Sequence, residues 1–101
     1  MPNLTVCVKH RLTVVEARRR VQMLMGELRR RLARHGQMQW RWKGNTLAFT
    51  LIALNMEVEG HVFLKRDVVR LKVVLPWLLA PLVTSLTDDI ENQARELLHR
   101  P

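Results

Sequence analysis

The chain is poor in cysteine and in long apolar runs. Cys7 is the only cysteine among 101 residues, which excludes an internal disulfide or a CxxC-type metal or redox site and fits a reducing compartment. The longest apolar run, "VVLPWLLAPLV" at 73–83, contains two prolines and is far shorter than the ~20 residues of a membrane span. The opening "MPNLTVCVKH" has no signal-peptide core. We therefore expect a cytoplasmic protein without a membrane span.

Acidic residues are also scarce. Nine Asp and Glu residues oppose 17 Lys and Arg residues, so the net charge is +8. The excess belongs to the front of the chain, where residues 1–44 hold 11 basic and two acidic residues, against six and seven in residues 45–101. This asymmetry indicates an anionic partner. The length fits a single domain over residues 1–101.

Hydrophobic spacing predicts five strands and two helices. Apolar residues alternate in "LTVCV", "MQWRW" and three later stretches, which is typical of half-buried strands. A T-x-x-E capping box at Thr13 and Glu16 predicts the start of the first helix, and Gly36 its end. "GN" at 44–45 predicts a hairpin turn with Gly44 at positive φ. Gly60 interrupts a strand as a bulge or a point of close packing.

The predicted order is β-α-β-β-β-β-α. It indicates an α+β domain of two layers, in which an antiparallel five-stranded sheet is covered on one face by two helices. The other face of the sheet is polar and mixed, so we expect it to be wet or to lie against a partner. An unpaired edge strand also makes a homodimer one possible assembly.

The first helix is rich in arginine. Residues 16–36 hold seven arginines and two glutamates. At 100° per residue, Ala17, Val21, Leu24, Leu28 and Leu32 form a core stripe, with arginine in every other direction. Spacing pairs Glu16 with Arg20 and Glu27 with Arg30 or Arg31. The candidate residues for contact with an anionic surface are Arg18, Arg19, Arg29, Arg30 and Arg34.

Three interpretations of these arginines stay open. They form a solvated face, or they meet an anionic surface or protein, or they bind nucleic acid. No helix-turn-helix, zinc ligand set or RNP-like motif supports sequence-specific recognition. Trp40 and Trp42 are able to stack on bases, but they share a stripe with Met38 and favour the core. Trp77, Leu78 and Leu79 are candidates for contact with an apolar surface, or else pack in the core.

No convergent set of catalytic groups is present. The histidines form no H-x-x-x-H or H-x-H pair for a metal, and neither a G-x-S-x-G elbow nor a phosphate-binding glycine loop occurs. Cys7 has only Lys9 nearby as a base, and His10 fits a hydrogen bond at a strand–helix junction. We expect a protein that is not an enzyme and that uses no metal and no cofactor.

Three motifs in order resemble a known family. "HRLTVVEAR" at 10–18, "WKGNTLAF" at 42–49 and "LPWLLAPLVTSLTDDIENQARELL" at 75–98 are similar to the motifs of the polyhydroxyalkanoic acid system proteins, also called granule-region proteins. His10, Trp42, Gly44 and Phe49 match family positions. The resemblance implies a bacterial cytoplasmic protein linked to storage polyester, and it carries over no catalytic residue.

The leading functional hypothesis is a non-enzymatic accessory protein that binds a polyester granule surface or a granule protein. The alternative is a nucleic-acid-binding module or regulator that uses the basic first helix. A third hypothesis is a carrier of small ligands, such as 3-hydroxyacyl compounds, with a cavity between the sheet and the helices.

Overall fold

The computed structural model describes residues 3–34, 36–53 and 55–99, except for the side chains of Leu32, Ala53, Leu79, Leu82 and Leu86. It confirms the predicted order of elements. They are β1 (Asn3–Lys9), α1 (Val14–Leu32), β2 (Gly36–Lys43), β3 (Thr46–Ala53), β4 (Met56–Leu64), β5 (Val68–Val74), the short 3-10 helix η1 (Trp77–Leu82) and α2 (Val83–Leu98).

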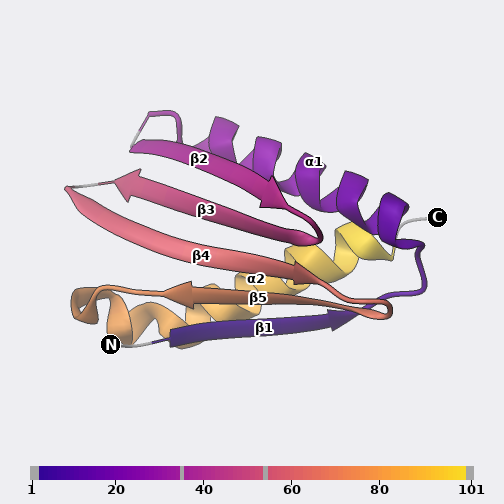
Figure 1. Ribbon diagram of the computed structural model, residues 1–101. Coiled ribbons are helices and arrows are strands. Elements are labelled where there is room, and N and C mark those ends of the chain that lie inside the picture. Colours follow the sequence, from indigo (N-terminus) through magenta and orange to yellow (C-terminus); the bar gives the residue numbers. More distant parts are fainter. Residues whose placement is uncertain (1–2, 35, 54, 100–101) are drawn as a thin grey trace.

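The five strands form one antiparallel sheet in the order β1-β5-β4-β3-β2. β2 to β5 are a meander, as predicted, and β1 pairs with β5 from Asn3 opposite Val74 to Lys9 opposite Val68. The first strand therefore forms one edge of the sheet and β2 forms the other. Both helices lie on the same side of the sheet (Figure 1). The predicted two-layer α+β class is confirmed.

Two tight turns set the register of the meander. Lys43 pairs with Thr46 across the first turn, where Gly44 has a φ of 59°, as the "GN" pair predicts. A glycine at the first central position is the signature of a type II′ hairpin turn. At the second turn Asn55 adopts a φ of 62°, a conformation that asparagine tolerates better than most residues.

α1 begins as predicted but ends early. The hydroxyl of Thr13 accepts a hydrogen bond of 3.1 Å from the backbone N–H of Glu16, which caps the first turn. The helix ends at Leu32 with Ala33 as its C-cap. Gly36 is not a helix cap: it pairs with Ala53 as the first residue of β2. Because Gly36 pairs with Ala53 in the sheet, it belongs to β2 and not to the end of α1.

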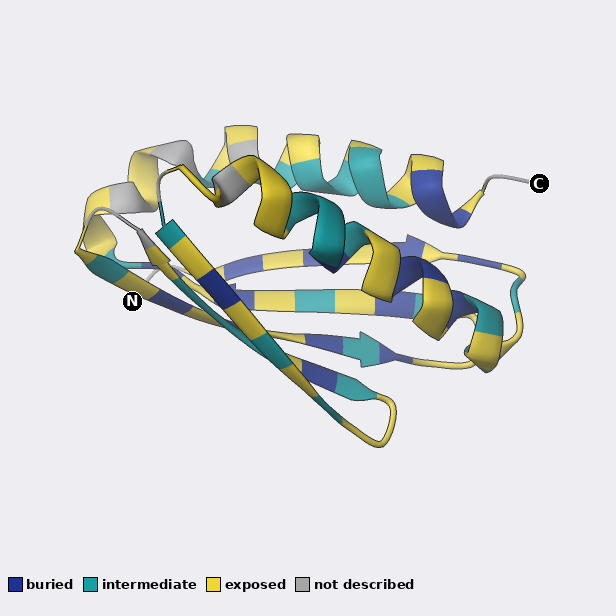
Figure 2. Ribbon diagram, turned by 90° about the horizontal axis from the view of Figure 1, so that it is seen from above, coloured by how far each residue is buried: buried dark blue, intermediate teal, exposed yellow. Residues whose placement is uncertain are grey.

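The core lies between the sheet and the helices. Buried and exposed residues alternate along the strands (Figure 2), with Leu4, Val6 and Val8 of β1 buried. Ala17 and Val21 of α1 are buried as predicted. Met25, which was not assigned to the core stripe, is buried too.

Gly60 is a point of close packing rather than a bulge. It pairs with Phe49 across β3 and β4, and a Cβ at Gly60 would lie only 2.3 Å from Cζ of the Phe49 ring. The ring therefore occupies the space that a side chain at position 60 would need.

Candidate functional site

Two of the candidate arginines of α1 hold the helix on β2. The guanidinium of Arg18 lies 4.5 Å from the ring centroid of Trp42 and donates to the Gly44 carbonyl at 3.2 Å. Arg29 lies 4.0 Å from the ring of Trp40 and donates to the Met38 carbonyl. Each cation–π contact is worth ~0.5–1 kcal/mol at an exposed site. The contacts of these two arginines therefore attach α1 to β2, which is a structural role.

Gln22 completes this contact between α1 and β2. Its side-chain oxygen accepts from the indole N–H of Trp40 at 3.1 Å and of Trp42 at 2.8 Å. Both tryptophans are half-buried, which agrees with the expectation of a packing role. Arg18, Gln22 and Arg29 lie on the same side of α1, so all three side chains reach the edge strand β2 or its turn.

Glu16 neutralises part of the basic face. Its carboxylate accepts from Arg19 and from Arg20, with Nε of Arg20 at 3.0 Å. The bond from Arg19 has the larger effect and that from Arg20 adds to it: together they lower the pKa of the Glu16 carboxyl to about 2. The same bond to Glu16 raises the pKa of Arg19. Spacing predicted the partner of Arg20 but left Arg19 without one within the helix. The structure corrects that point.

Arg20 differs from its neighbours because it is buried, with 9% of its surface exposed. Its Nη1 donates to the carbonyl of Leu97 at 2.9 Å, near the end of α2. A charged side chain in the interior needs such partners. Arg20 therefore ties the two helices together, a role that helical spacing alone did not reveal.

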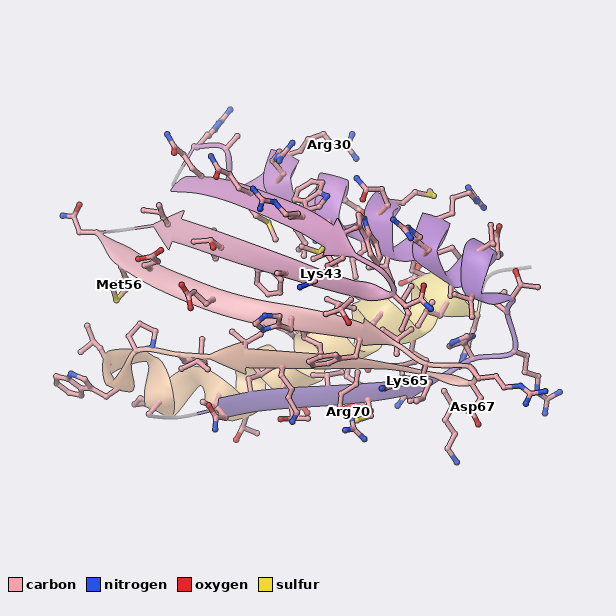
Figure 3. All side chains as sticks on the ribbon, viewed as in Figure 1. Arg30, Lys43, Met56, Lys65, Asp67 and Arg70 are labelled. Atoms are coloured by element: carbon pink, nitrogen blue, oxygen red, sulfur yellow. The ribbon has the colours of Figure 1, made fainter. Side chains whose placement is uncertain are left out.

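Two candidate cations remain turned to solvent. The side chains of Arg30 and Arg34 are exposed and make no ion pair or hydrogen bond within the described residues, whereas Arg31 pairs with Glu27 at 3.0 Å. Figure 3 shows Arg30 on α1, beyond the β2 edge of the sheet. The free charge of this face is thus smaller than the seven arginines of residues 16–36 indicate.

The short helix η1 presents apolar side chains to water. Trp77 is 76% exposed and Leu78 is 60% exposed. Leu79, the third residue predicted for this surface, has a side chain outside the described part of the chain. η1 follows Pro76 and contains Pro81, which lies two residues before the start of α2. Trp77 and Leu78 together are named the apolar corner below.

The family positions are explained by local contacts. His10 is buried; its Nδ1 accepts from the backbone N–H of Leu12 at 3.1 Å, and its Nε2 lies 3.3 Å from the Lys65 carbonyl. It therefore joins the β1–α1 junction to the β4–β5 turn, as expected of a junction histidine. Trp42 supports Arg18, Gly44 makes a turn, and Phe49 covers Gly60. These contacts are structural.

The outer sheet face carries a cluster of cations that hydrophobic spacing did not single out. The register aligns Arg41 with Ala48, His61 and Lys72 in one cross-strand row, and Lys43 with Thr46, Phe63 and Arg70 in the next. No acidic residue belongs to either row. His61 and Phe63 stack in the middle, 5.9 Å between ring centroids.

The four cations of these rows, Arg41, Lys43, Arg70 and Lys72, are exposed. None of these four side chains has an ion-pair or hydrogen-bond partner among the residues that the structure describes. Figure 3 looks onto this face and shows Lys43 and Arg70 on it. Glu57 and Glu59 occupy rows nearer the other end of the sheet. The name "basic rows" is used for this cluster of four. This face is exposed in the single chain, and its contact with water or with a partner stays a prediction.

A cavity of about 330 Å³ lies between the sheet and the helices. Its described walls come from all five strands and both helices, and Gln93 is the only wall residue with a polar side chain. At ~24 cal/mol per Å³, a closed and empty cavity of this size would forfeit on the order of 8 kcal/mol of packing, and this one is partly open. That is a large amount for a protein whose total stability is ~5–15 kcal/mol.

The described residues provide neither a metal-binding cluster nor a membrane-spanning helix. Within them no group of three or more His, Cys, Asp or Glu side chains converges to hold a metal ion. None of the described helices is both long and apolar enough to cross a membrane.

These features define a small α+β protein with helices on one sheet face, an open and partly basic opposite face, and an apolar interior cavity. The chain belongs to the polyhydroxyalkanoic acid system family: the family model described as "Putative polyhydroxyalkanoic acid system protein" matches residues 4–98. The resemblance noted in the sequence is therefore confirmed. No curated protein and no solved structure matches the chain.

Proposed function

We propose that this protein is a non-enzymatic accessory protein that associates with polyester granules in the cytoplasm. Family membership supports the link to polyhydroxyalkanoate. The observation that supports a way of binding to the granule is the apolar corner, where Trp77 and Leu78 are adjacent and mostly exposed. Large exposed apolar residues side by side mark interaction sites, and tryptophan suits a boundary between an apolar phase and water.

The corner supplies a moderate driving force. Burying a large apolar side chain contributes ~1.5–3 kcal/mol, so Trp77 and Leu78 together contribute roughly 3–6 kcal/mol before the cost of immobilisation. Arg30 and Arg34 add about 1 kcal/mol each near an anionic surface, and salt weakens that term. α1 lies toward the β2 edge of the sheet and η1 follows β5 (Figure 1). The corner and these arginines therefore act as separate contacts.

Co-sedimentation with purified polyester granules tests the proposal. The double variant Trp77→Ser, Leu78→Ser is expected to lose most of the bound protein. The matched control is Val15→Ser with Met23→Ser, which removes two other exposed apolar residues from α1 and should leave binding unchanged.

Charge and location are tested separately. Arg30→Glu with Arg34→Glu should weaken binding at low salt and have little effect at high salt. In cells that make polyester, a fluorescent fusion should gather at granules. Diffuse protein, or equal loss of binding in the corner and control variants, would contradict the proposal.

A second candidate function is binding of single-stranded nucleic acid, and the basic rows favour it over the α1 face first considered. Stacked aromatic rings flanked by cations on an open sheet are a common platform for single strands. Phe63→Ala and Lys72→Glu should then weaken binding of an oligonucleotide, while Arg30→Glu should not. Affinity should fall steeply with salt. Retention of full affinity in both sheet variants would remove this candidate.

A further inference from the structure

The exposure of the residues that line the cavity supports its presence, as its volume does. Phe49 and Leu51 of β3 and Leu71 of β5 lie on the helix-facing side of inner strands, yet each is only half-buried. Leu4, on the edge strand β1, is 1% exposed. The middle of a covered sheet is normally its best-buried part. The helices therefore leave a hollow over these parts of β3 and β5, whereas Val58 and Val62 of the middle strand β4 are buried.

Both helices also turn half-buried apolar residues toward this hollow. Leu24 and Leu28 of α1 and Ile90 and Ala94 of α2 line it and are of intermediate exposure. The helices are joined at one end, where Arg20 bonds to the Leu97 carbonyl. The apolar lining thus includes the inner face of the sheet and both helices.

The chemistry of the walls restricts what the cavity can bind. No charged side chain is among the described lining residues, and the amide of Gln93 is the only polar side chain available for a hydrogen bond. Phosphates, sugars and nucleotides would lose hydration without finding partners. An aliphatic chain has no polar groups to desolvate and gains apolar contact with the walls.

The size of the cavity sets the length of such a chain. A cavity of about 150 Å³ holds a benzene ring of about six carbons, so a cavity of 330 Å³ holds a chain of roughly ten carbons. A chain much longer than this would have to leave part of itself in water.

We propose that this cavity binds the hydrocarbon chain of a medium-length alkanoyl or 3-hydroxyalkanoyl compound, one molecule per protein. The choice of an alkanoyl compound, rather than another aliphatic one, rests on the proposed link to polyester metabolism. The chain lies between the inner face of the sheet and the two helices, and Gln93 offers a hydrogen bond to a polar group. The site is distinct from the apolar corner and from the basic rows.

Isothermal titration calorimetry with decanoic and 3-hydroxydecanoic acid tests the site. Saturable binding at one molecule per chain is expected, with hexanoic acid and hexadecanoic acid each at least tenfold weaker. Ala94→Phe fills part of the cavity and should lower the affinity for decanoic acid at least tenfold. Ala48→Phe is the matched control, because Ala48 is an exposed alanine on the other face of the sheet. It should change the affinity by less than twofold.

A second measurement does not depend on the folding of a variant. In methyl NMR spectra of the wild-type protein, decanoic acid should shift the signals of Leu71 and Ile90 and leave that of Leu78 in place. Absence of saturable binding, shifts confined to Leu78, or unchanged affinity in a folded Ala94→Phe variant would each overturn the proposal.

Failure of this inference and failure of the granule proposal are distinguishable. Ala94→Phe should still co-sediment with granules, and the Trp77→Ser, Leu78→Ser variant should still bind decanoic acid. If the corner variant loses both activities while it remains folded, the chain-binding site is not the interior cavity.

Discussion

Substitution of Gly60 by alanine should destabilise the protein through one ring. The new Cβ would lie 2.3 Å from Cζ and 2.7 Å from Cε1 of Phe49, and 3.0 Å from the Lys72 carbonyl oxygen. Carbon atoms in good contact are ~3.5–4.0 Å apart, so the ring must move by more than about 1 Å. Overpacking of this kind costs ~1–3 kcal/mol. Because Phe49 borders the cavity, the ring has space to retreat, and we expect about 1–2 kcal/mol.

A double-mutant cycle isolates the contribution of the ring. In a Phe49→Ala background the ring is gone and only the Lys72 carbonyl oxygen stays close to the new Cβ. Gly60→Ala should then be neutral or stabilising by up to ~1 kcal/mol, since glycine is unfavourable in a strand. The coupling free energy should be about 2 kcal/mol. Urea unfolding of the four proteins, followed by circular dichroism, measures it.

Gly26→Ala provides the control for this cycle. Gly26 lies within α1, and a Cβ there meets nothing within 4 Å, so alanine should stabilise the helix by roughly 0.5–1 kcal/mol. If Gly60→Ala costs the same with and without Phe49, the obstacle is the Lys72 carbonyl and the assignment to the ring is wrong.

Three further outcomes are expected from the contacts of α1 and the first hairpin. Arg20→Ala should cost about 2–3 kcal/mol in urea unfolding, because it leaves the Leu97 carbonyl without this donor, whereas Arg30→Ala should stay within ~0.5 kcal/mol. Because the pKa of Glu16 falls from 4.5 to about 2 on folding, the unfolded state binds more protons between these values. The stabilisation by the ionised Glu16 carboxylate is complete above pH 4.5 and is lost as the pH falls toward 2. Glu16→Gln should therefore make the midpoint of urea unfolding less dependent on pH over that range. An unchanged pH dependence of the midpoint would contradict the pairing. Gly44→Ala should lower the melting temperature more than Gly44→Asn, since asparagine tolerates a φ of 59° better.

The fold follows from local patterns that the sequence displays directly. Alternation identifies the strands, Thr13 caps the first helix, and Gly44 makes the first hairpin. The end of α1 was misplaced because Gly36 satisfies two rules, that of a helix cap and that of a strand start. Pairing with Ala53 decides between them, and that pairing is a tertiary contact.

The surfaces were harder to predict because they depend on which elements meet. Helical geometry placed Arg18 and Arg29 on one flank of α1, but only the structure puts Trp42 and Trp40 beneath them. The basic rows require the strand register, which joins Arg41 to Lys72 across four strands. The cavity depends on the separation between the helices and the sheet, and no sequence pattern encodes that distance.

The three tryptophans divide between two environments, and this gives the protein its own optical reporter. Trp40 and Trp42 are half-buried, share the Gln22 oxygen and lie under guanidinium groups, whereas Trp77 is open to solvent. Acrylamide should therefore quench Trp77 selectively. A blue shift of that quenchable fraction on addition of granules would follow adsorption in real time without a label.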